Sequence, residues 1–152
     1  MLEIIIIAIG KTKNEFFSEA IREYLTRLKP YAVVKILELT PESFNDSNRE
    51  KAKQLEGERI VRALEKYDRS DVFLLHERGK EMTSVKFSEK LAETGKMVFA
   101  IAGALGFNEA ILAKYQQLSL SEMTFPHELA RLVLLEQIYR AATIIKGKTY
   151  HY

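Results

Sequence analysis

The polar residues best placed for chemistry stand where three apolar segments of the sequence end. These segments are LLHERGK (74–80), IAGALGFN (101–108) and LSLSEMTFPH (118–127), and they carry glycines, hydroxyl groups and histidines. Glycine lets a backbone approach a ligand closely, and hydroxyls and exposed backbone amides can bind one through hydrogen bonds. Ligands of open parallel sheets bind at the carboxyl ends of the strands. The three segments therefore predict a common binding site, although glycine turns are frequent for purely structural reasons.

His127 and Arg131 are four residues apart, so on a helix they would share one side of its first turns. A helix N-terminus and an arginine both favour negative charge nearby. The alternative is structural, with His127 bonded to the preceding loop and Arg131 a solvated surface charge. The spacing alone does not decide between them.

Several well-known catalytic and cofactor signatures are absent from the chain. The GALG turn (103–106) lacks the third glycine of a dinucleotide fingerprint, and neither a phosphate-binding P-loop nor a G-x-S-x-G elbow occurs. There is no H-E-x-x-H motif, and three scattered histidines without cysteine make a metal site unexpected. We therefore expect no metal.

The composition fits one domain over residues 1–152, because 47% of the residues are hydrophobic. The absence of cysteine suits a reducing compartment, and the apolar run 4–9 is too short to span a bilayer. We therefore expect a cytoplasmic protein with no membrane partner. A net charge of +2 is low for a general nucleic-acid-binding protein, so contact with RNA would need charge gathered locally or from two subunits.

The period of the apolar pattern alternates between strand and helix. Strands are expected at 2–9, 31–39, 71–77, 97–103 and 118–121, and helices at 14–30, 49–67, 83–93, 108–115 and from 126 to about 146. Residues 78–82 are expected to form a turn, Thr83 or Ser84 to cap the third helix, and Gly147 to end the last one. This order predicts an α/β fold with a mostly parallel sheet.

The last helix is apolar around most of its circumference, with a narrow polar strip that holds Glu136 and Arg140. These two residues have the favourable order for an ion pair four residues apart. A helix of this kind is buried on most sides. A second copy of the chain in a two-fold homodimer would cover it, and so would other elements of the same chain.

The segments quoted above, with IIAIGK (6–11) and the ending IIKGKTYHY (144–152), resemble the RlmH family of SPOUT-class RNA methyltransferases. The resemblance covers essentially the whole chain. It implies a SPOUT-type α/β knot, with helices on both faces of the sheet and a C-terminal trefoil knot that the residues alone do not predict. It also implies a homodimer that binds S-adenosylmethionine. The implied reaction is methylation of N3 of a pseudouridine in large-subunit (23S) ribosomal RNA within the assembled ribosome.

Carried over residue by residue, the resemblance places the cofactor against three segments. The implied cofactor-binding residues are Leu75, Ala102, Gly103, Gly106, Leu120, Ser121, Glu122, Met123, Thr124 and Phe125. Apolar side chains and main-chain groups suit an uncharged adenine ring. The chain departs from the family at Ala102, where a glycine is usual and where a methyl group fits only if φ is negative, and at His76.

The implied reaction also suggests roles for His127 and Arg131. The nucleophile begins as an imide N–H, so the protein must position it and remove a proton. His127 is the candidate base or proton shuttle, since the reference pKa of imidazole is about 6.5. Arg131 is the candidate for stabilising negative charge or binding phosphate.

The chain ending is expected to contact RNA. Lys148 would meet phosphates, Tyr150 and His151 would stack on a splayed base, and Arg140 is placed with them. The alternative for such a segment is simple fraying. Two other functions remain open: a non-enzymatic RNA-binding module of the same fold, which needs no cofactor, and a small-molecule enzyme, which would not methylate ribosomal RNA.

Overall fold

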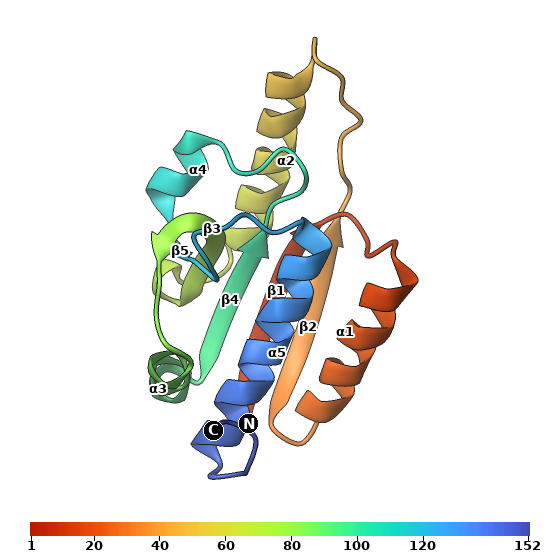
Figure 1. Cartoon of the computed structure of the whole chain (residues 1–152). Helices are drawn as coiled ribbons and strands as arrows, with labels where there is room; N and C mark the ends of the chain where they lie inside the picture. Colours follow the sequence, from red (N-terminus) through yellow and green to blue (C-terminus); the bar gives the residue numbers. More distant parts are fainter.

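Five parallel strands form one sheet in the order β2-β1-β4-β3-β5 (Figure 1). The computed structural model describes residues 1–152. The strands are β1 (Leu2–Ile9), β2 (Ala32–Leu39), β3 (Val72–Lys80), β4 (Lys96–Ile101) and β5 (Gln116–Leu118). Because every neighbouring pair is parallel, all the carboxyl ends lie at one edge of the sheet.

Helices cover both faces of the sheet, which confirms the predicted α/β class (Figure 1). On one face lie α1 (Glu15–Leu28), α3 (Ser84–Thr94) and α5 (His127–Ile145). On the other face lie α2 (Arg49–Leu64) and α4 (Glu109–Lys114), and a short 3-10 helix (Arg69–Asp71) precedes β3. No helix is both long enough and apolar enough to cross a membrane.

The continuous isoleucine run of β1 follows from its central place in the sheet. Ile4 and Ile6 pack into the core under α1, α3 and α5, while Ile5 and Ile7 pack into the core under α2 and α4. Successive side chains of a strand point to opposite faces, so a strand covered on both sides needs an apolar residue at every position.

Local sequence signals set most helix boundaries. The side chain of Asn14 caps α1, that of Thr83 caps α3 and that of Asn108 caps α4, each by accepting a backbone N–H of the first turn. Gly147 has φ +63°, a left-handed conformation that favours glycine at the end of α5. The predicted capping by Thr83 and the predicted end at Gly147 are confirmed.

The ends of β3 and β5 differ from the prediction. β3 continues through Lys80, where a turn was expected, and β5 ends at Leu118 instead of Ser121. A Cβ on Gly79 would lie 2.8 Å from the carbonyl carbon of Gln117, so only glycine permits this close approach. An irregular register then pairs Lys80 with Leu118. Residues 119–126 are consequently a loop.

Helix α5 packs on the sheet between α1 and α3 (Figure 1). Its side chains Leu134, Leu135 and Ile138 are completely buried. Leu129 and Val133 stay partly exposed. The same chain therefore covers the flanks and the inner side of this apolar helix, and an outer strip remains partly open.

Candidate active site

A cleft of about 690 Å³ lies at the carboxyl edge of the sheet. The later part of β3, the turn after β4 and the beginning of α5 line it, and their residues include Leu75, Ala102, Gly103, Gly106, Thr124, Phe125 and His127. The three segments singled out in the sequence therefore meet at one place. Leu75, Thr124 and Phe125 also line a smaller adjoining hollow of about 60 Å³.

The remaining expected cofactor residues lie around the smaller hollow, with one exception. Leu120, Ser121 and Met123 line it, although the Met123 side chain is 78% exposed. Glu122 lines neither space and faces a separate surface depression with Glu77. The structure thus brings every residue of the expected cofactor set except Glu122 to the cleft and its adjoining hollow.

The backbone of both loops contains hydrogen-bond donors that the chain itself does not use. No acceptor within the chain takes the N–H groups of residues 103–105, 120, 121, 124 or 125. Ser119 and Ser121 hold the second loop together: the Ser119 hydroxyl donates to the Ser121 carbonyl (2.8 Å), and the Met123 N–H donates to the Ser121 hydroxyl (3.0 Å). The loops are therefore supported while several of their amides remain available.

The turn after β4 depends on its glycines. The N–H of Gly106 donates to the carbonyl of Gly103 (3.1 Å), and Gly106 has φ +74°. At Gly103 an added Cβ would lie 2.9 Å from Cγ2 of Ile9, which leaves no room for a side chain. Ala102 has a negative φ, since no residue other than glycine has a positive one, so its backbone accommodates the methyl group.

The His127 ring is half-buried at the wall of the cleft and makes no hydrogen bond within the chain. Its neighbour Glu128 fixes the beginning of α5, because its Oε1 accepts the backbone N–H groups of Lys13 and Asn14. The predicted alternative, in which His127 bonds the preceding loop, is not what the structure has. Both ring nitrogens are free for a substrate.

Arg131 does not line the cleft, although it lies one helical turn from His127. Its guanidinium is buried, with Nη1 2.7 Å from Oε2 of Glu38 and Nη2 donating to the carbonyl of Gly10 (3.1 Å). The interpretation of Arg131 as a solvated surface charge is wrong, because its side chain is only 5% exposed. The long side chain reaches across the sheet edge to β2, where a carboxylate neutralises it.

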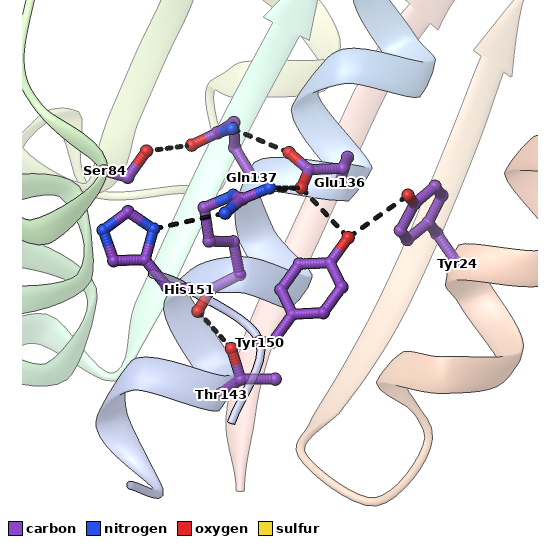
Figure 2. Close-up of polar contacts among 8 residues, drawn as sticks. Tyr24, Ser84, Glu136, Gln137, Thr143, Tyr150 and His151 are labelled. Atoms are coloured by element: carbon purple, nitrogen blue, oxygen red, sulfur yellow. Dashed lines mark hydrogen bonds and ion pairs between the residues drawn. The ribbon is translucent and has the colours of Figure 1, made fainter. Parts of the chain in front are cut away.

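Three of the residues expected to bind RNA, Arg140, Tyr150 and His151, cluster around Glu136, midway along α5 (Figure 2). The hydroxyl of Tyr150 donates to Oε1 of Glu136 (3.1 Å) and lies 3.4 Å from the hydroxyl of Tyr24. Arg140 binds the same Oε1 (2.6 Å), lies 4.9 Å from the centre of the Tyr150 ring and contacts Nδ1 of His151 (3.2 Å). The predicted pair of Glu136 and Arg140 is confirmed, and the chain ending is folded back rather than frayed.

The polar network raises the pKa of two of its residues, Tyr150 and Arg140. Burial, followed by the hydrogen bond with Tyr24 and the negative charge of Glu136, raises the pKa of Tyr150 above its ordinary value of 10.0. The hydrogen bond to Glu136 raises the pKa of Arg140. At neutral pH the cluster therefore holds a protonated phenol and a paired guanidinium.

The cleft and the Tyr150 cluster lie far apart within one chain. The cleft borders His127 at the beginning of the 19-residue helix α5, whereas the cluster centres on Glu136 and Arg140. These residues lie about 14 and 20 Å further along the helix at the usual rise per residue. Lys148, like His151, is exposed at the far end. One chain alone therefore does not bring these residues to the cleft.

A family model described as "Predicted SPOUT methyltransferase" matches residues 2–151. The chain belongs to the SPOUT methyltransferase family. Three curated relatives carry the name "Ribosomal RNA large subunit methyltransferase H". The protein of Kosmotoga olearia is 42% identical to this chain, and the alignment covers 94% of this chain and 95% of the relative. The protein of Parabacteroides distasonis is 43% identical, and its alignment covers 99% of each chain. The protein of Thermodesulfovibrio yellowstonii is also 43% identical, over 94% of each chain. The resemblance to this family is thereby confirmed.

Solved structures support the fold of this SPOUT methyltransferase. A probable methylase family protein from Haemophilus influenzae superposes with a TM-score of 0.62 at 18% identity, over all of this chain and 72% of the other. TrmJ from Z. mobilis gives 0.53 at 14% identity, again over all of this chain and 72% of the other. At such identities the likeness concerns the fold alone.

Some residues of the cleft and of the Tyr150 cluster gave no usable sequence signal. Lys53 reaches the cleft from α2, and Tyr24 reaches the Tyr150 cluster from α1. On their helices both look like ordinary amphipathic positions. Only the packing of α1 and α2 on the sheet brings them to these places.

Proposed function

We propose that this SPOUT methyltransferase transfers the methyl group of S-adenosylmethionine to N3 of a pseudouridine in large-subunit ribosomal RNA within the assembled ribosome. The observation that carries the proposal is the convergence of two loops with unengaged backbone amides beside the free His127 ring. The names of the relatives support ribosomal RNA as the substrate. The nucleotide, the atom and the ribosomal state come from the resemblance of the sequence to its family.

The residues present fit S-adenosylmethionine. Leu75, Leu120 and Phe125 are partly buried apolar side chains that pack against the core and suit an adenine ring. The amides of residues 103–105 and of the 120–125 loop can bond polar atoms of the nucleoside and the amino acid. The volume of the cleft lies within the range of ordinary ligand sites, about 300–1,000 Å³. When bound, the cofactor supplies an activated methyl group on a sulfonium.

His127 is positioned to take the proton from N3 of the base. Its ring nitrogens have no partner in the chain, so one can accept the imide proton while the loop amides orient the reactants. Arg131 is committed to Glu38 and Gly10, so we assign it a positioning role: it holds the first turns of α5, and thus His127, against the sheet edge.

A two-fold homodimer would reunite the cleft with the RNA-contact residues. The outer strip of α5, with Leu129 and Val133, is partly exposed in one chain and would be covered by a second copy. If the two α5 helices run antiparallel, the Arg140, Lys148, Tyr150 and His151 group of one protomer lies beside the cleft of its partner. Each site would then contain residues of both chains.

The same proposal includes a trefoil knot in the C-terminal part of the chain. Its support is the resemblance of the sequence to its family. Backbone physics makes knots rare.

The experiment is transfer of a labelled methyl group from S-adenosylmethionine to ribosomes from a strain without this activity. We expect one modified pseudouridine by mass mapping, and a much lower rate on protein-free ribosomal RNA. Equal rates on both substrates would remove the requirement for the ribosome. Calorimetry that detects no cofactor binding would favour the RNA-binding module, and cofactor binding without label in RNA would favour a small-molecule enzyme.

A further inference from the structure

Glu56 is a buried carboxylate behind the cleft that the reaction described above does not use. It lies on α2 and is only 4% exposed. Its Oε2 accepts the backbone N–H of Glu42 (3.0 Å). Its Oε1 is buried without any hydrogen-bond donor. A buried carboxylate oxygen without a donor is unfavourable, so a partner is expected in the working state of the protein.

The free oxygen of Glu56 faces the turn after β4. A Cβ placed on Gly103 would lie 3.4 Å from Oε1 of Glu56. The next residue of α2, Gly57, lies close to the far end of the turn, since a Cβ added to it would lie 2.9 Å from Nδ2 of Asn108. Two consecutive residues of α2 therefore support both ends of this cofactor-binding turn from behind.

The turn supplies the donors that Glu56 lacks. The backbone N–H groups of Gly103, Ala104 and Leu105 have no acceptor within the chain. An unpartnered acceptor thus lies next to the turn that carries these unpartnered donors. Glu56 is not among the residues that line the cleft, so it acts on a ligand through the turn and not by contact.

We propose that Glu56 is a positioning residue for the cofactor site, an inference that rests on the proposed function. In the cofactor-bound protein its Oε1 accepts a backbone N–H of residues 103–105 and holds the turn in its binding conformation. A hydrogen bond to a charged acceptor is stronger than one between neutral groups. The carboxylate therefore stabilises the bound form of the turn relative to its free form.

The test compares the affinity of the wild-type protein, Glu56→Gln and Glu58→Gln for S-adenosylmethionine by calorimetry. The glutamine keeps the volume of Glu56 and an acceptor for the Glu42 N–H, but presents an NH₂ group to the turn. We expect the Kd of Glu56→Gln to rise about tenfold, the loss of one charge-assisted hydrogen bond. Glu58→Gln removes the same charge from an exposed position of α2 and should leave the Kd unchanged.

Amide hydrogen exchange of residues 103–105 gives a second readout, which is local to the turn and whose wild-type part needs no variant. Cofactor should slow exchange of one of these amides more than tenfold in the wild-type protein, and less in Glu56→Gln. Equal affinities and equal protection in the wild type and Glu56→Gln would overturn the role of Glu56 while leaving the proposed function intact. Failure of the wild-type protein to bind the cofactor would overturn both.

Discussion

Arg131, which is buried, and Glu38, which is partly exposed, form an ion pair that joins the first turns of α5 to the end of β2, with Nη1 and Oε2 2.7 Å apart. The same guanidinium bonds the carbonyl of Gly10 at the end of β1. The pair therefore fixes the helix that carries His127 to two strand ends at the edge of the sheet where the cleft lies. Its effect on activity should come from this positioning.

Replacing Glu38 should destabilise the fold, because the Arg131 charge would stay buried without its partner. We expect Glu38→Gln to lower the free energy of unfolding by about 2 kcal/mol, less than for a fully buried pair because Glu38 is 33% exposed. Chemical denaturation measures this. The exposed pair of Glu3 and Lys96 provides the control, since Glu3→Gln should cost less than about 0.5 kcal/mol. If both variants lose the same free energy of unfolding, the burial of Arg131 does not make its ion pair more stabilising than an exposed one.

Removing the imidazole at the cleft should slow the chemical step. We expect His127→Ala to lower kcat by about 10²- to 10⁴-fold, the usual contribution of a positioned acid or base, with little change in the cofactor Kd. Single-turnover methylation of ribosomes and calorimetry measure the two quantities. A rate within threefold of the wild type would exclude His127 as the base.

The turn glycine Gly106 should be needed for cofactor binding as well as for stability. Gly106 and Gly147 both have positive φ and no atom within 4 Å of an added Cβ, so alanine at either position should cost about 1 kcal/mol of stability through backbone strain alone. Only Gly106→Ala should also raise the cofactor Kd, because Gly147 lies at the far end of α5. A rise in Kd for both variants would mean that the effect is one of general stability.

Tyr150 should ionise at a higher pH than an ordinary tyrosine. Its pKa is raised in the folded protein, so its contribution to stability is complete below about pH 10, the unfolded pKa, and is lost as the pH rises further toward the folded value. Ultraviolet titration of phenolate should show a delayed component that Tyr150→Phe removes. If that variant titrates like the wild type, the buried cluster with Glu136 does not persist in solution.

Mixing two inactive variants tests whether each site contains residues of both chains. His127→Ala and a Tyr150→Ala/His151→Ala protein should each be inactive as homodimers. If the tail acts on the partner's cleft, a mixed dimer has one intact site, and equal mixing restores about a quarter of wild-type activity. Mixed dimers without activity would show that the tail serves its own chain.

Local patterns determined much of this protein. The double burial of Ile4 to Ile7, the cap at Thr83 and the end of α5 at Gly147 follow from periodicity and from backbone preferences of single residues. The convergence of three loops at one sheet edge follows from the parallel order of the strands. Each of these signals depends on residues close together in the sequence, or on the order of the elements alone.

Only the tertiary structure decided which side chains meet. Arg131 binds Glu38 across 93 residues of sequence, Tyr150 meets Tyr24 across 126, and Glu56 lies behind Gly103. The extension of β3 likewise depends on Gly79 passing against β5. Such contacts depend on the register and packing of whole elements, which bring distant residues within a few ångströms. Periodicity records that a side chain is buried or polar, but it does not record which partner it finds.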